Sequence, residues 1–136
     1  MTPVKTNNNA TIGKKSAVSK TQGDQAEAWA LDYLQQNGWQ LVAANFRSAF
    51  GEIDLIVKQQ KLLLFVEVKQ RVSARFGTAQ AMVTAQKQQK IILTSQYFLQ
   101  QHSQYQQYHL RYDVIAIDTQ SGTPQITWLP NAFYAY

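Results

Sequence analysis

The stretch that decides the fold is residues 51–71, GEIDLIVKQQKLLLFVEVKQR. It contains two apolar runs rich in Val, Ile, Leu and Phe, residues 53–58 and 61–69, on either side of Gln59 and Gln60. Runs of such continuous hydrophobicity are typical of strands at the buried centre of a sheet. We therefore predict that the two runs form a β-hairpin at the centre of an α/β sheet.

Four charged side chains interrupt this hairpin: Glu52, Asp54, Glu67 and Lys69. A charge in a buried strand costs free energy unless it is paired or bound to a ligand. Side chains alternate across a strand, so Glu52 shares a face with Asp54, and Glu67 shares a face with Lys69. The hairpin is therefore the first place to look for chemistry.

The register of the hairpin decides whether Asp54 and Glu67 meet. A tight turn at the two glutamines places Asp54 opposite Phe65, with Glu67 diagonally across on the same face. A four-residue loop over residues 58–61 keeps this pairing, whereas a slip of one residue sends Glu67 to the other face. We predict the first arrangement, in which the two carboxylates can share one ion.

The flanking sequence predicts two helices and three further strands around the hairpin. The helices are expected over residues 24–36 and 84–101, and the strands over residues 39–46, 110–118 and 125–129. Their order favours a single α/β domain over residues 23–136, with helices on both sides of a sheet. Residues 1–22 are polar and lack periodicity, which predicts a disordered basic arm.

Composition excludes several classes of protein. The chain has no cysteine, so it has neither a disulfide framework nor a thiolate zinc site. The longest apolar run, residues 62–66, is too short to cross a bilayer, and no signal-peptide pattern follows Met1. We therefore expect a cytoplasmic protein without a membrane partner.

The net charge of +5 does not by itself indicate a nucleic-acid partner. Residues 1–20 hold four of the 13 Lys and Arg residues and no acid, so nine basic residues face eight acidic ones elsewhere. The folded part is nearly neutral. The arm could add non-specific affinity for phosphate, or be a solvated extension.

A carboxylate cluster with one lysine is the chemistry that the remaining residues favour. The two histidines lack metal-site spacing, and no phosphate-binding glycine loop is present. Carboxylates are ligands that Mg²⁺ and Mn²⁺ prefer, and Lys69 could steady a developing phosphate charge. The alternative is a structural ion pair of Lys69 with Glu67 or Asp54. Glu27 falls inside the apolar face of the first helix, where its periodicity suits a snorkelling side chain and a functional acid equally.

The spacing from Asp54 to the triplet Glu67-Val68-Lys69 resembles the core motif of the PD-(D/E)XK nuclease superfamily, with Ile53 in place of the proline. A wider resemblance, to the YraN-like bacterial protein family, covers about residues 22–133. It rests on residues 51–56 (GEIDLI) and 65–69 (FVEVK), together with Asn45-Phe46-Arg47, Arg75-Phe76-Gly77, Val83 followed by Lys87, Tyr112-Asp113-Val114 and Asn131-Ala132-Phe133.

This resemblance implies a restriction-endonuclease-like αβββαβ core, with a mixed central sheet flanked by helices. It implies that Asp54, Glu67 and Glu27 are catalytic acids that bind Mg²⁺ or Mn²⁺, and that Lys69 is the catalytic lysine. Glu52 and Asp113 are expected to support the site, with a purely structural role as the alternative for Asp113. The candidates for phosphate contact are Arg47, Arg71, Arg75 and Lys87.

The function that the resemblance implies is a metal-dependent nuclease acting on DNA, with branched or damaged DNA as candidate substrates. Similarity to Holliday-junction resolvases also implies a homodimer. Two alternatives stay open: a non-catalytic nucleic-acid-binding or adaptor domain with the same fold, and a structural protein–protein module whose charges form ion pairs.

Overall fold

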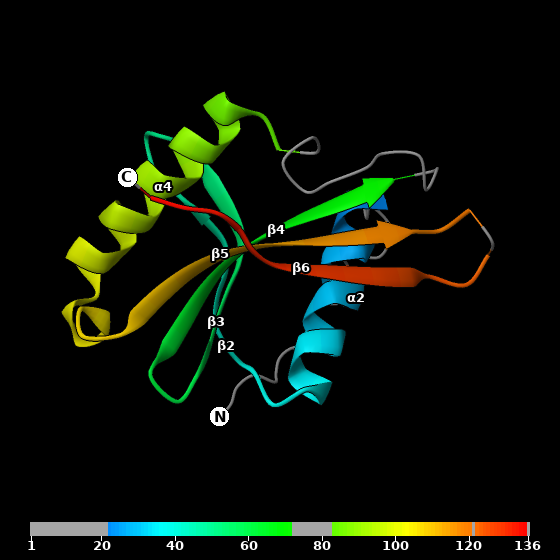
Figure 1. The fold of residues 1–136 in the computed structure, drawn as a ribbon, viewed down its shortest axis with the longest axis horizontal. Helices are drawn as coiled ribbons and strands as arrows, with labels where there is room; N and C mark the ends of the chain where they lie inside the picture. The colour runs from blue at the N-terminus through cyan, green and yellow to red at the C-terminus, as the bar shows by residue number, and fades with distance from the viewer. Residues whose placement is uncertain (1–21, 72–82, 121, 136) are drawn as a thin grey trace, which may run out of the picture.

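The computed structural model describes residues 22–71, 83–120 and 122–135 (Figure 1). Within these residues the helices are α2 (Gln22–Gln36) and α4 (Ala85–Gln101), with one 3-10 turn, η2 (Ser103–Tyr105). The strands are β2 (Gln40–Arg47), β3 (Glu52–Gln59), β4 (Leu62–Arg71), β5 (His109–Asp118) and β6 (Gln125–Phe133). The predicted order of helix, three strands, helix and two strands is confirmed. The arm predicted for residues 1–22 lies outside the described residues, except that Gln22 already begins α2.

The strands form one mixed sheet in the order β2-β3-β4-β5-β6. Neighbouring strands are antiparallel except β4 and β5, which run parallel and are joined through α4. The two helices lie on opposite faces of the sheet (Figure 1). The structure is therefore α/β, consistent with the αβββαβ core that the sequence predicted.

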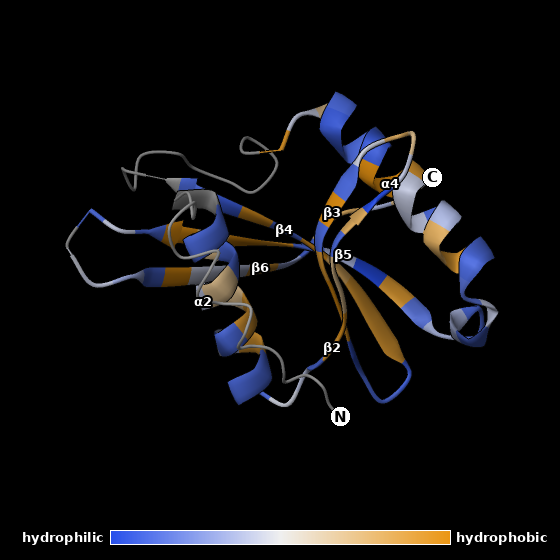
Figure 2. Cartoon of the chain, turned by 180° about the vertical axis from the view of Figure 1, so that it is seen from behind, coloured by the Kyte–Doolittle hydropathy of each residue, from blue (hydrophilic) through white to orange (hydrophobic). Residues whose placement is uncertain are grey.

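Each helix buries one apolar stripe against its face of the sheet. In α2 the side chains of Ala26, Ala30 and Leu34 are almost fully buried, as the helical periodicity predicted. In α4 the corresponding residues include Ile91 and Phe98, which pack on the other face. Figure 2 shows the apolar colour concentrated on the strands, with polar residues along the outer sides of the helices. No helix among the described residues is long and apolar enough to cross a membrane.

The hairpin register differs from the prediction. Ile56, and not Asp54, pairs with Phe65, and the ladder runs from Gln59↔Leu62 to Leu55↔Val66. The turn is therefore centred one residue later than predicted, with Gln60 in the left-handed region at φ 55°. Moving the turn by one residue shifts the pairing by two, so Asp54 and Glu67 keep the same relative face.

The most important feature of the sheet for function is where β3 and β4 separate. Their ladder ends at Leu55↔Val66, whereas β4 continues to pair with β5 as far as Arg71. Asp54 and Glu67 are the next residues beyond this last pair. The two strands thus form a fork, and the two predicted metal ligands lie at its opening.

Candidate functional site

Asp54 holds the two arms of the fork together. Its Oδ2 atom accepts a hydrogen bond from the backbone N–H of Val68, at 2.8 Å. This contact replaces the main-chain pairing that ends one residue earlier. It also directs the Asp54 carboxylate towards β4, beside the residue that follows Glu67.

Glu67 is a buried acid with a basic partner. Its side chain is only 5% exposed, and its Oε2 atom lies 3.0 Å from the Nζ atom of Lys87. Burial and the negative charge of Asp54 raise the pKa of Glu67 to about 7, although Lys87 and Lys69 act to lower it. The two lysines therefore do not fully compensate the buried charge of this carboxylate.

Glu27 reaches the same acids from α2. Burial and the charge of Asp54 raise the pKa of Glu27 to about 7, while a hydrogen bond from the Asn45 side chain acts to lower it. When protonated, Glu27 donates a hydrogen bond to Asp54. The break that Glu27 makes in the apolar stripe of α2 therefore places a carboxylate beside the fork.

Asn45 was not identified as a site residue from the sequence. It lies in β2 with φ 53°, a conformation that asparagine tolerates better than most residues, and its side chain reaches Glu27. An asparagine inside an otherwise apolar strand was the available signal.

Lys87 lies within the acidic cluster, although the sequence predicted it only as a phosphate contact. Burial acts to lower the pKa of Lys87, but the charges of Glu67, Asp54 and Glu52 raise it overall. Lys87 occupies the first turn of α4, where its backbone N–H donates to the capping Oγ1 of Thr84 at 3.1 Å. A cation is unfavourable near a helix N-terminus. The ion pair with Glu67 offsets that cost.

Glu52 and Arg47 form the rim of the cluster. The Arg47 Nε atom lies 3.7 Å from Glu52 Oε1, and the Arg47 side chain is 75% exposed. Such an exposed pair contributes little to stability, which leaves Arg47 available to a ligand. The charge of Glu52 also acts on Glu27 and Lys87.

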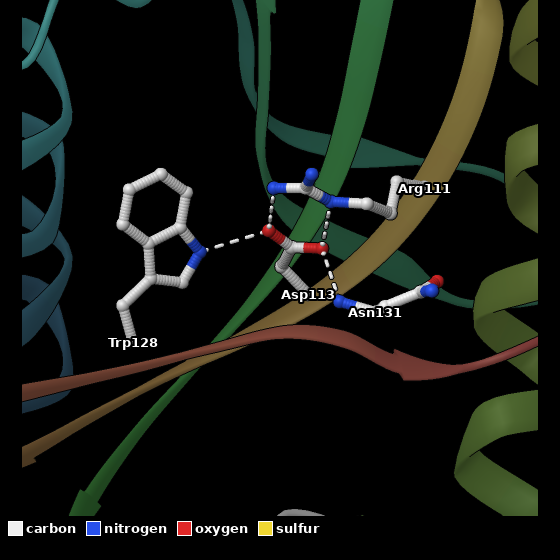
Figure 3. Close-up of polar contacts among 4 residues, drawn as sticks. All are labelled: Arg111, Asp113, Trp128 and Asn131. Atoms are coloured by element: carbon white, nitrogen blue, oxygen red, sulfur yellow. Dashed lines mark hydrogen bonds and ion pairs between the residues drawn. The ribbon is translucent and has the colours of Figure 1, made fainter.

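Asp113 of β5 holds this strand to β6 through a separate network of hydrogen bonds (Figure 3). Arg111 donates to both of its oxygens, at 3.0 and 2.9 Å, and the Trp128 indole N–H donates to Oδ2 at 2.8 Å. The backbone N–H of Asn131 donates to Oδ1 at 2.9 Å, where β6 has an irregularity and Asn131 has φ 56°. These contacts suit the structural alternative for Asp113.

Two further residues were predicted to contact phosphate, Arg71 and Arg75. Arg71 ends β4, where its backbone is paired with that of Asp118 in β5. Arg75 lies outside the described residues. The structure therefore brings together Glu27, Glu52, Asp54, Glu67, Lys69 and Lys87, with Arg47 at their edge.

The donor set suits an open magnesium or manganese site. Among the described residues, no group of three or more His, Asp or Glu side chains is arranged to enclose a metal ion by itself. Magnesium usually takes one or two protein carboxylates, with waters and substrate phosphate completing its shell. Asp54 and Glu67 could supply these two carboxylates. A cation beside them would stabilise the ionised form of Glu67, which burial and the charge of Asp54 disfavour. Asp54 and Glu67 as metal ligands, with Glu27 as a third, stay predictions.

Comparison with known proteins gives the family. The model of the uncharacterised protein family UPF0102 matches residues 26–117, which include the whole fork. The chain belongs to the UPF0102 family. The resemblance to the YraN-like family that the sequence indicated is thereby confirmed.

Several UPF0102 proteins are similar to this chain over most of its length. One from Legionella pneumophila is 41% identical over 118 residues, covering 87% of this chain and 98% of its own. One from Saccharophagus degradans is 46% identical over 111 residues, covering 82% and 91%. One from Acinetobacter baylyi is 48% identical over 96 residues, covering 71% and 69%. As a UPF0102 protein, the chain shares its folded part with these relatives.

Proposed function

We propose that this UPF0102 protein is a metal-dependent nuclease that hydrolyses phosphodiester bonds in DNA. The observation that carries the proposal is the convergence of Glu27, Asp54 and Glu67, from three different elements, at a fork in the sheet. Two of these acids have a pKa raised to about 7. Neighbouring carboxylates, one buried and two partly buried, destabilise the fold unless a cation compensates them, so the arrangement is typical of a site with a function.

The residues divide into ligands and cations. Asp54 and Glu67 would hold Mg²⁺ or Mn²⁺, which when bound polarises the phosphodiester and lowers the pKa of an attacking water. Glu27, next to Asp54, can accept a proton from water at its carboxylate. Lys69, on the Glu67 face of β4, stabilises the negative charge that develops on the phosphate oxygens. Lys87 is released from Glu67 to contact the same phosphate.

The PD-(D/E)XK resemblance supports this assignment independently of the geometry. The spacing from Asp54 to Glu67 and Lys69 matches the superfamily motif. A cytoplasmic location and a homodimer, as in junction resolvases, are further parts of the proposal. Size-exclusion chromatography with light scattering would measure the oligomeric state directly.

The experiment combines metal titration with cleavage assays. Calorimetric titration of Mg²⁺ and Mn²⁺ into the wild type should show binding that Asp54→Ala and Glu67→Ala each abolish. Asp32→Asn is the matched control, because it removes an exposed carboxylate of α2 that accepts a hydrogen bond from Gln36 of the same helix. Cleavage of branched, single-stranded and duplex DNA should depend on the metal and be lost in the same two variants.

The outcomes separate the alternatives. Metal binding without cleavage of any DNA would favour the non-catalytic nucleic-acid-binding or adaptor domain. No metal binding, even with DNA present, would overturn the nuclease proposal.

A further inference from the structure

The loop between β2 and β3, residues 48–51, presents an aromatic ring to solvent just before the strand that carries Asp54. The Phe50 side chain is 46% exposed. It lies two residues before Glu52 and four before Asp54. A single exposed apolar residue is ordinary on a protein surface, so the inference depends on how this ring is held and what surrounds it.

The loop is fixed by hydrogen bonds rather than left free. The Ser48 backbone N–H donates to the Gly51 carbonyl at 2.8 Å, and the Phe50 N–H donates to Ser48 Oγ at 3.0 Å. Ser48 Oγ also bonds Thr94 Oγ1 of α4 at 3.1 Å. Because Thr94 is fully buried, the loop is anchored in the protein interior. The backbone that carries Phe50 is therefore ordered before any ligand arrives.

The same loop packs directly against α4. A Cβ atom placed on Gly51 would lie 3.4 Å from the Lys90 Cβ and 3.7 Å from Thr94 Oγ1. Phe50, the residue before Gly51, is therefore carried by a backbone that is held against α4. A loop that is already ordered loses little conformational entropy when it binds.

The segments that flank this loop carry cationic side chains, and Lys90 of α4 packs against Gly51. Lys87 and Lys90 are three residues apart on α4 and share one face of the helix. Arg47, at the end of β2, is 75% exposed immediately before the loop. An aromatic ring among exposed cations, next to a carboxylate site, matches the composition of surfaces that bind unpaired nucleic acid strands. There the cations bind phosphates and the ring stacks on a base.

We propose that Phe50 stacks on an unpaired base of the DNA strand that enters the fork, so that the protein prefers DNA with unpaired nucleotides over intact duplex. This rests on the proposed function and specifies its substrate. In duplex DNA both faces of an interior base are already stacked, so Phe50 would have no base to contact. An unpaired nucleotide offers a free face, and its phosphate is then near Arg47 and Lys90.

The test measures DNA binding in EDTA, so that neither metal nor cleavage enters it. Fluorescence anisotropy would compare a single strand with the matching duplex for wild type, Phe50→Ala and Phe50→Trp. Base–aromatic stacking is worth about 1–3 kcal/mol, so Phe50→Ala should weaken single-strand binding by about tenfold. The affinity of Phe50→Ala for the duplex should change by less than about twofold. Phe50→Trp, which keeps an aromatic ring, should bind the single strand as tightly as wild type.

A stacking readout separates this role from a structural one. The fluorescence of a 2-aminopurine base placed in the single strand should be quenched by wild type and by Phe50→Trp, but not by Phe50→Ala. Leu110→Ala is the control, because Leu110 is similarly exposed at 40% but lies beside Leu63, on the early part of β4. It should behave as wild type.

Unchanged single-strand affinity and quenching in Phe50→Ala would overturn this inference and leave the nuclease proposal intact. An equal loss on single strand and duplex, without rescue by Phe50→Trp, would also overturn it. A third outcome separates the two proposals. If Phe50→Ala weakens single-strand binding selectively and Phe50→Trp does not, but the wild-type protein cleaves no DNA, base stacking is supported and the nuclease proposal fails.

Discussion

The groups around Glu67 have opposite effects on its pKa. Burial and Asp54 favour the protonated acid, whereas Lys87 and Lys69 favour the carboxylate. The result is a group that changes charge close to neutral pH. Such a group has consequences for stability that can be measured without knowing the substrate.

The first prediction concerns stability against pH in EDTA. The folded pKa of Glu67, about 7, lies above its ordinary value of 4.5. The folded state therefore binds the proton more tightly than the unfolded state does. The stability that this proton contributes is fully present below pH 4.5 and is lost as the pH rises through 7. Urea unfolding should show that Glu67→Gln loses less stability than wild type between pH 4.5 and 8, by roughly 1–3 kcal/mol. Parallel pH profiles for the two proteins would contradict the raised pKa.

The second prediction concerns Lys87. Removing the ammonium in Lys87→Met leaves the nearly buried Glu67 carboxylate without its ion pair. Because the Lys87 side chain is 48% exposed, we expect a cost of about 1–3 kcal/mol when the acid is charged, less than for a fully buried pair. Unfolding at pH 8 should show this loss, and at pH 5, where Glu67 is protonated, the loss should be much smaller. The double variant with Glu67→Gln should recover most of it. Lys90→Met, an exposed cation of the same helix, is the control and should change stability little.

At the scale of elements, the β5–β6 pair depends on one buried acid. Asp113 accepts from Arg111, Trp128 and Asn131, and Trp128 packs edge-on against Tyr33 and Trp39, with centroids 6.2 and 6.0 Å apart. The network therefore links the edge strand to α2 and to the segment after it. It also accommodates Pro130, which lacks an N–H and is tolerated because β6 is an edge strand.

The third prediction is that Asp113→Asn destabilises the protein by about 2–4 kcal/mol. Both oxygens of Asp113 accept from N–H donors, and an amide NH₂ in place of one oxygen would face a donor instead. Urea unfolding would measure the loss. Asp118→Asn is a matched change on the same strand, where the aspartate accepts one exposed N–H from Gln120, and it should cost under about 1 kcal/mol. Equal losses in the two variants would contradict the role of the network.

At the scale of the whole molecule, the central strands of the sheet are better paired and more deeply buried than those at its edges. Strands β4 and β5 each pair on both sides, and their central residues are fully buried between the two helices. Within the described part of the chain, strands β2 and β6 pair on one side only, and both contain register irregularities. The fork lies between β3 and β4. Glu67 and Lys69 are therefore carried by β4, a central strand that pairs with β5 along its whole length.

The fourth prediction is a gradient of hydrogen exchange across the sheet. Backbone amides near Phe65, Val66 and Ile115 should exchange slowest, close to the rate set by global unfolding, whereas those of β2 and β6 should exchange faster. Exchange measured by mass spectrometry on peptic fragments would resolve these strands. Protection of β2 equal to that of β4 would contradict the gradient.

The sequence alone determined the elements, their order and the face of α2 that is buried. Periodicity is a local property, because side-chain direction repeats every 3.6 residues in a helix and every two in a strand. The same alternation put Asp54 and Glu67 on a common face even though the predicted turn was misplaced by one residue. A left-handed Gln60 set the true turn, and no local pattern marks a glutamine for that conformation.

Only the tertiary structure decided which groups meet. Glu27 of α2 meets Asp54 and the Asn45 side chain of β2, and Lys87 of α4 meets Glu67. These contacts depend on how the elements pack on the sheet. The anchoring of Phe50 by Thr94 likewise joins residues far apart in the chain. Charge, burial and hydrogen bonding act through space rather than along the sequence. The acid motif was therefore visible in one stretch, whereas its protonation and its partners were set by the fold.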